Sequence, residues 1–163
     1  MKAKKLTGLA VLTGISLIIF AIEMQIPYPF PIPGIKLGLA NVVTVYALYR
    51  YRAGDVVMIV LCRILLASIF SGNTMALLYS FAGSFLCLTG MLFLRRIIDE
   101  KHIWICSIFG AVLHNIGQIT VAVILLGVST LVYLPFLLVS GCLAGAFTGI
   151  CAQLVIQRMN KYF

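Results

Sequence analysis

The sequence predicts an all-α integral membrane protein with six transmembrane helices and both termini in the cytoplasm. Of its 163 residues, 63% are hydrophobic and only 10% are charged, whereas soluble domains carry about 25% charged residues. A chain of this length cannot bury so much apolar surface in a core of its own. The basic residues also lie at the ends of the apolar segments. We therefore expect residues 1–163 to form a single transmembrane domain.

Six apolar segments follow one another along the chain. A transmembrane helix needs about 20 apolar residues, with a lower limit near 17. Lipid offers no hydrogen-bond partners to the backbone, so these segments must be helices. The first continues too far to be a signal peptide and is read as a retained helix. The predicted helices are Leu6–Met24, Leu37–Tyr49, Asp55–Phe70, Thr74–Leu94, Ile103–Leu126 and Thr130–Ile156.

The connections between these helices differ in character. Residues 25–36 contain four prolines in seven positions, which forbid a helix and favour a stiff, extended path. We expect this loop to form a lid, and its candidate lid residues are Tyr28, Phe30, Pro31, Pro33 and Gly34. Short turns at 71–73 and 127–129 predict two antiparallel helix hairpins.

Lysine and arginine show a strong bias between the two sides of the predicted bundle. One side carries Lys2, Lys4, Lys5, Arg50, Arg52, Arg95, Arg96, Lys101, Arg158 and Lys161. The other side carries only Lys36, and Arg63 lies inside the third helix. The positive-inside rule therefore predicts a multi-pass protein of the bacterial cytoplasmic membrane with the proline-rich loop outside. The net charge of +8 is assigned to orientation rather than to nucleic-acid binding.

Polar residues gather in the outer half of the predicted bundle. Arg63 is close to mid-membrane, where a charge costs at least about 2.5–3.5 kcal/mol and usually faces a cavity or a partner. The other candidate substrate-binding residues are Lys36, Asn41, His114, Asn115, Gln118, Glu23 and Asn73. Together they predict an outward-facing pocket with positive charge, suited to a carboxylate or phosphate.

Each of these residues also has a purely structural interpretation. Arg63 could form an ion pair with Glu23. His114 and Gln118 could hydrogen-bond between helices and hold them together. Asn73 fits a turn, and Lys36 could extend to the membrane interface.

Several classes of site are not predicted. The chain has no Walker sequence for nucleotide hydrolysis, and its four acidic residues form no aspartate-rich cluster that would hold Mg²⁺ for prenyl diphosphate chemistry. We therefore expect a protein that is not an enzyme, without cofactor or metal. Ala10 and Gly14 lie four residues apart, a spacing that lets another membrane subunit dock closely.

Several stretches resemble one known family. They are Pro31–Thr44 (PIPGIKLGLANVVT), Arg63–Leu66, Phe70–Gly72 and Gly110–Gln118 (GAVLHNIGQ). They resemble the Gx transporter family, also labelled heptaprenyl diphosphate synthase component I, over nearly the whole chain. That family is similar to the substrate-binding subunits of energy-coupling-factor transporters. The resemblance implies a six-helix bundle with an outward pocket that the first loop closes. It also implies two kinds of partner, a transmembrane coupling subunit and an ATPase pair, and it implies that Ala10 and Gly14 touch the coupling subunit.

Two hypotheses follow. The first is a substrate-binding subunit of an importer that captures a small anionic vitamin-like compound or an isoprenoid, quinone or flavin precursor. The second is a non-catalytic membrane component that recruits a soluble heptaprenyl diphosphate synthase through its basic cytoplasmic loops.

Overall fold

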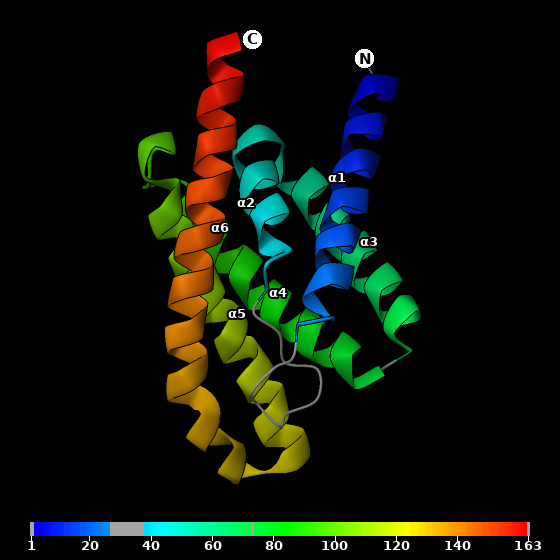
Figure 1. The fold of residues 1–163 in the computed structure, drawn as a ribbon, viewed down its shortest axis with the longest axis vertical. Helices are drawn as coiled ribbons and strands as arrows, with labels where there is room; N and C mark the ends of the chain where they lie inside the picture. The colour runs from blue at the N-terminus through cyan, green and yellow to red at the C-terminus, as the bar shows by residue number, and fades with distance from the viewer. Residues whose placement is uncertain (1, 27–37, 73, 163) are drawn as a thin grey trace.

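The computed structural model describes residues 2–26, 38–72 and 74–162. Over these residues the chain forms six α-helices and two short 3-10 helices. In Figure 1 the helices form an elongated bundle, and both chain ends lie at the same end of it. The elements are α1 (Lys2–Glu23), α2 (Asn41–Arg50), α3 (Ala53–Ser71), α4 (Thr74–Leu94), η1 (Glu100–His102), α5 (Ile103–Leu126), η2 (Val128–Tyr133) and α6 (Leu134–Tyr162).

Five of the six α-helices are long and apolar enough to cross a bilayer, namely α1, α3, α4, α5 and α6. Helix α2 has only 10 residues, or about 15 Å of helix, roughly half of the hydrocarbon thickness. Within the described residues, the prediction of six helices with a short second one is therefore confirmed, and five of the six are long enough to span a bilayer.

Helix α2 also begins later than predicted. The sequence predicts a helix from Leu37, which lies outside the described residues, but residues 38–40 are not helical and α2 starts at Asn41. Gly38 has a φ of +79°, a left-handed conformation that glycine adopts at no steric cost. The amides of Gly38 and Leu39 donate to the Glu23 carboxylate at 2.6 and 3.1 Å. The chain therefore turns at Gly38 and is held by α1 before it enters the helix.

The last helix is shifted relative to the prediction of residues 130–156. Residues 128–133 form the 3-10 helix η2, and α6 runs from Leu134 to Tyr162. Pro135 is the second residue of α6, in the first turn, where its missing amide costs no helical hydrogen bond. Proline thus marks the true start, and α6 continues past Ile156 because no helix-breaking residue follows.

Two apolar clusters lie above and below a layer of polar side chains. The larger cluster contains Val45, Leu48, Ile59, Met91 and Ile156 and involves all six α-helices. The smaller one contains Tyr79, Ile119, Ala122 and Leu137. Along α5, the buried polar residues His114, Asn115 and Gln118 fall between the residues of the two clusters. The polar layer is therefore enclosed by the bundle.

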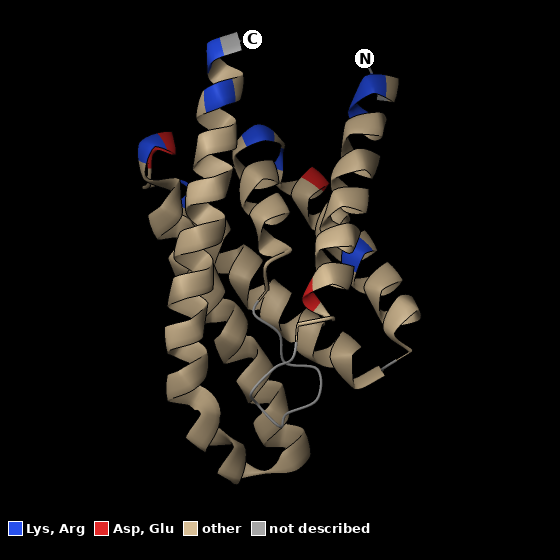
Figure 2. Ribbon diagram, viewed as in Figure 1, with Lys and Arg blue, Asp and Glu red and all other residues tan. Residues whose placement is uncertain are grey.

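The outer surface is apolar and the charges lie at one end. Large side chains such as Phe85, Phe93 and Phe147 are each 63% exposed, as expected where lipid replaces water. Figure 2 shows lysine and arginine concentrated at the end that carries both termini, apart from one blue segment midway along α3, which is Arg63. Among the described residues, no lysine or arginine lies at the opposite end.

Candidate functional site

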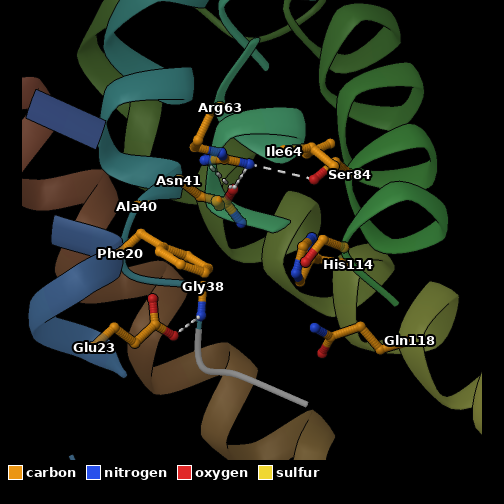
Figure 3. Close-up of a pocket in the computed structure, with 12 residues that line it drawn as sticks. Phe20, Glu23, Gly38, Ala40, Asn41, Arg63, Ile64, Ser84, His114 and Gln118 are labelled. Carbon is orange, nitrogen blue, oxygen red and sulfur yellow. Dashed lines mark hydrogen bonds between the residues drawn. The ribbon is translucent and has the colours of Figure 1, made fainter. Parts of the chain in front are cut away.

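A small cavity lies in the polar layer, and five helices contribute to its wall. Figure 3 shows these side chains converging from α1, α2, α3, α4 and α5. The lining residues are Phe20, Glu23, Gly38, Ala40, Asn41, Arg63, Ile64, Ala67, Ser80, Ser84, His114 and Gln118. Of the residues predicted to bind a solute, the structure therefore brings together Arg63, Asn41, Glu23, His114 and Gln118.

Arg63 is the central charge of the site. Its side chain comes from the middle of α3, and the residue is only 7% exposed. Its guanidinium donates to Asn41 Oδ1 at 3.3 Å, to Thr44 Oγ1 at 3.4 Å and to Ser84 Oγ at 3.3 Å. All three acceptors are neutral, so these contacts orient the guanidinium without cancelling its charge.

The structure does not form the ion pair between Arg63 and Glu23 that the sequence left open. Across the described residues, no carboxylate oxygen lies within 4.0 Å of the Arg63 guanidinium, and the ion pair that does form joins Lys5 and Asp55 at 2.7 Å. The Glu23 carboxylate instead accepts the amides that precede α2. A carboxylate at a helix N-terminus is favourable because it faces the positive end of the helix dipole.

His114 and Gln118 present polar atoms to the cavity. They lie one turn apart on α5 and are 5% and 1% exposed, and helical spacing puts both on one face. Among the residues that the structure describes, His114 Nδ1 and Gln118 Oε1 have no hydrogen-bond partner. Buried polar atoms are nearly always paired, with protein or with ordered water. Gln118 Oε1 therefore marks a place where water or a ligand belongs, whereas His114 Nδ1 lies against Gly83 of α4.

Close packing of α4 against α5 places His114 in the wall. A Cβ atom at Gly117 would lie 2.6 Å from the Ala82 carbonyl oxygen, and one at Gly83 would lie 2.9 Å from His114 Nδ1. Only glycine permits this approach, because any side chain would overlap the facing backbone. Both glycines are thus part of the architecture of the site.

The cavity is narrow in the structure. It offers about 30 Å³ to the centres of water-sized spheres, and one water needs roughly 10–15 Å³ on that measure. This volume accepts two or three waters, or a group as small as a carboxylate. Arg63 is the donor, amides and hydroxyls lie beside it, and the Glu23 carboxylate on the same wall is already engaged by the amides of Gly38 and Leu39. The arrangement around the guanidinium therefore suits a compact anion.

Asn115 is not part of this cavity. Its Nδ2 donates to the Leu137 carbonyl oxygen on α6, and it lies against Gly141 of the same helix. The structure therefore places Asn115 outside the cavity lining, with its side chain joining α5 to α6, and its role in binding stays a prediction. The physical reason is that His114 and Asn115 are adjacent, so their side chains leave α5 about 100° apart.

The remaining predicted residues divide into two groups. Ala10 and Gly14 line a surface groove between α1 and α3, away from the cavity. The other group lies outside the described residues, so its predicted roles stay predictions. It consists of Lys36, Asn73 and the lid residues Tyr28, Phe30, Pro31, Pro33 and Gly34.

The sequence reasoning missed four polar or aromatic residues of the site. Thr44 and Ser84 hydrogen-bond to Arg63, and Phe20 and Ser80 line the cavity. Helical spacing offered a signal, because Thr44 is three residues after Asn41 and Ser84 is four residues after Ser80. In the described part of the chain, no three His, Cys, Asp or Glu side chains cluster in a way that could hold a metal ion.

Comparison with known proteins identifies a family but no close relative. A family model described as heptaprenyl diphosphate synthase component I matches residues 12–155. No curated protein and no solved structure matches the chain significantly. The matched range covers α2 to α5 completely and most of α1 and α6. By this match, the chain is a membrane-type, all-helical protein that belongs to the heptaprenyl diphosphate synthase component I family.

Proposed function

We propose that the chain is the solute-binding membrane subunit of an energy-coupling-factor-type importer, and that its solute is a small anion. The observation that carries the proposal is Arg63: a buried guanidinium with neutral partners on the wall of a cavity. Burial of a guanidinium that touches no carboxylate is costly, and charges inside membrane segments usually serve a solute or ion pathway. Glu23 lies on the same cavity wall but accepts the amides of Gly38 and Leu39, so an anionic solute would supply the negative charge in direct contact with Arg63.

The neighbouring polar atoms support binding rather than catalysis. The side chains of His114 and Gln118, which line the cavity, would orient the solute beside Arg63 by hydrogen bonds. In this proposal Arg63, His114 and Gln118 bind and orient the solute without changing it, and we infer that the chain is not an enzyme. Energy for transport would come from an ATPase pair acting through a transmembrane coupling subunit. The groove that contains Ala10 and Gly14 is the proposed docking face for that subunit.

The charge distribution supports one orientation in the membrane. Lysine and arginine concentrate at the end that carries both termini, and such residues favour the cytoplasmic side. We infer that this end lies in the cytoplasm of a bacterial cell. Residues 25–36, which connect α1 and α2, then lie on the outer side, from which the solute would be captured.

The test is mass spectrometry of small molecules that co-purify with the full chain in mild detergent. Wild-type protein should carry an anionic compound, and Arg63→Gln should lose it. The charged hydrogen bond is worth about 1.5–3 kcal/mol, so affinity should fall roughly tenfold to 150-fold. Arg96→Gln, an exposed arginine at the basic end, is the matched control and should retain the compound. Equal retention by both variants would refute the proposal.

The family description favours a second candidate function. A protein described as component I of heptaprenyl diphosphate synthase could be a non-catalytic membrane partner that holds a soluble synthase. The basic end, with Arg95, Arg96 and Lys101, would be its docking surface. Affinity capture of the chain from mild detergent separates the two functions. An importer subunit should retain an ATPase and a coupling protein. A membrane partner of the synthase should retain a prenyl diphosphate synthase, and Arg63→Gln should not change that retention.

A further inference from the structure

A second hollow borders the Arg63 cavity on the lipid side of the bundle. It is an apolar groove between α3 and α4, called here the α3–α4 groove. The groove has a volume of about 290 Å³, compared with about 30 Å³ for the cavity, and both volumes are the space open to the centres of water-sized spheres. Its floor is formed by Val60, Ile64, Ser84 and Leu88, and its rims include Leu61 and Phe85.

The floor and the rims differ sharply in exposure. The four floor residues are each at most 8% exposed, whereas Leu61 and Phe85 are 41% and 63% exposed. The groove is therefore open toward the surface that lipid covers, and side chains of α3 and α4 separate it from the interior of the bundle. Its lining is almost entirely apolar, with Ser84 and Thr89 as the exceptions.

The cavity and the groove share two side chains. Ile64 and Ser84 line both hollows, so the partition between them is one side chain thick. Figure 3 shows Ser84 across the cavity from Glu23 and Phe20 of α1, on the wall that borders the groove. The Ser84 hydroxyl that lies at the groove floor also accepts a hydrogen bond from Arg63 at 3.3 Å. The Ser84 side chain therefore lies between the positive charge of Arg63 and the apolar α3–α4 groove.

We propose that the solute is an amphiphile whose compact anionic head lies beside Arg63 and whose hydrocarbon tail passes between α3 and α4 into the groove. This inference rests on the proposed function, because it assigns the solute of the same cavity. Charge complementarity places the head, and the apolar lining of the groove keeps the tail away from the polar lining of the cavity. The small cavity volume indicates a head of carboxylate size.

Thr89 offers a way to block the groove without disturbing the core. It is exposed on the groove side of α4, and its Oγ1 donates to the Phe85 carbonyl oxygen at 2.8 Å. Thr120 is a matched control on α5: it is also exposed, and its Oγ1 donates to the Ile116 carbonyl oxygen at 2.7 Å. Thr89→Phe should fill the groove, whereas Thr120→Phe adds the same ring to a surface remote from it.

The experiment measures equilibrium binding of butanoate, dodecanoate and dodecanol to the full chain in detergent. Wild-type protein should bind dodecanoate more tightly than butanoate, by roughly twofold to fourfold for each methylene that the groove buries. Thr89→Phe should weaken dodecanoate at least tenfold and leave butanoate unchanged, and Thr120→Phe should behave as wild type. Arg63→Gln should abolish the preference for dodecanoate over dodecanol.

The outcomes separate this inference from the proposed function. If Thr89→Phe and Thr120→Phe bind dodecanoate equally, the groove is only lipid-facing surface or a contact for another helix, and the amphiphile is refuted. If butanoate binding depends on Arg63 but chain length has no effect, the anion site stands and the tail does not. If no acid depends on Arg63, both proposals fail. Arg63→Lys, which keeps the charge, is tested alongside in case Arg63→Gln does not fold.

Discussion

The contact between Gly83 and Gly117 makes the most demanding prediction, because it connects helix packing to the binding site. In Gly117→Ala, the new Cβ would lie 2.6 Å from the Ala82 carbonyl oxygen and 2.7 Å from Gly83 Cα. Both neighbours are backbone atoms that cannot rotate away. Carbon atoms prefer separations of about 3.5–4.0 Å, so α4 and α5 would have to move apart by about 0.8 Å at this crossing.

The expected loss of stability follows from two opposing terms. Overpacking of this kind costs typically 1–3 kcal/mol, and replacing glycine by alanine inside a helix returns up to about 1 kcal/mol. The net destabilisation is therefore about 0–2 kcal/mol when the full alanine gain applies, which lowers the thermal unfolding midpoint by up to roughly 8 °C for a chain of this size. Because Gly83 also touches His114, the same shift should weaken solute binding.

The assay is thermal unfolding of the purified chain in detergent, with Gly14→Ala as the control. A Cβ at Gly14 meets nothing within 4 Å, so this variant should have an unchanged or slightly raised midpoint. Opposite signs for the two alanine variants are the expected result. A Gly117→Ala protein as stable as Gly14→Ala would show that α4 and α5 do not approach as the structure describes, and the account of how His114 reaches the cavity would be wrong.

Three further predictions address the rest of the chain. Asn115→Ala should lower the free energy of unfolding by about 0.6–2 kcal/mol, the value of one interhelical hydrogen bond, and leave solute affinity unchanged. Gln118→Ala should weaken solute binding with a smaller loss of stability, and isothermal titration calorimetry and thermal melts on both variants separate the two roles. Lys5→Ala should leave the unfolding midpoint nearly unchanged even at low salt, because the Lys5 side chain is 48% exposed, although that of Asp55 is 15% exposed, and ion pairs with an exposed partner contribute little. A large drop would contradict this. A cysteine introduced at Lys4 should react with a membrane-impermeant maleimide only after the cells are permeabilised, whereas a cysteine introduced at Ser129 should react in intact cells. The reverse pattern would overturn the proposed orientation.

Much of the architecture could be read from residue types alone. Helices α4 and α5 have the same bounds as the ranges predicted from hydropathy, Thr74–Leu94 and Ile103–Leu126. The helix ends are signalled locally, since Gly72 and Gly127 have positive φ at the turns. Helix α2 was harder, because its length depends on the interaction of Gly38 and Leu39 with Glu23, fifteen and sixteen positions earlier in the chain.

The candidate site was predictable in composition but not in arrangement. Arg63 stands out in the sequence because it is a charge within an apolar helix, and the structure places it on a cavity wall. The sequence could not say that its partners would be Asn41, Thr44 and Ser84, nor that Glu23 would instead hold the start of α2. Partners from different helices depend on how each helix is rotated and where it crosses its neighbours.

The sequence by itself determined that this is a membrane-type protein and how charge is distributed along the chain. Hydropathy and the positions of lysine and arginine are local properties, so they require no knowledge of contacts between helices. Only the tertiary structure decided that His114 faces the cavity while the adjacent Asn115 faces α6. That choice is made by the close crossing of α4 and α5 at Gly83 and Gly117, because the rotation of a packed helix is set by the shape of its neighbours.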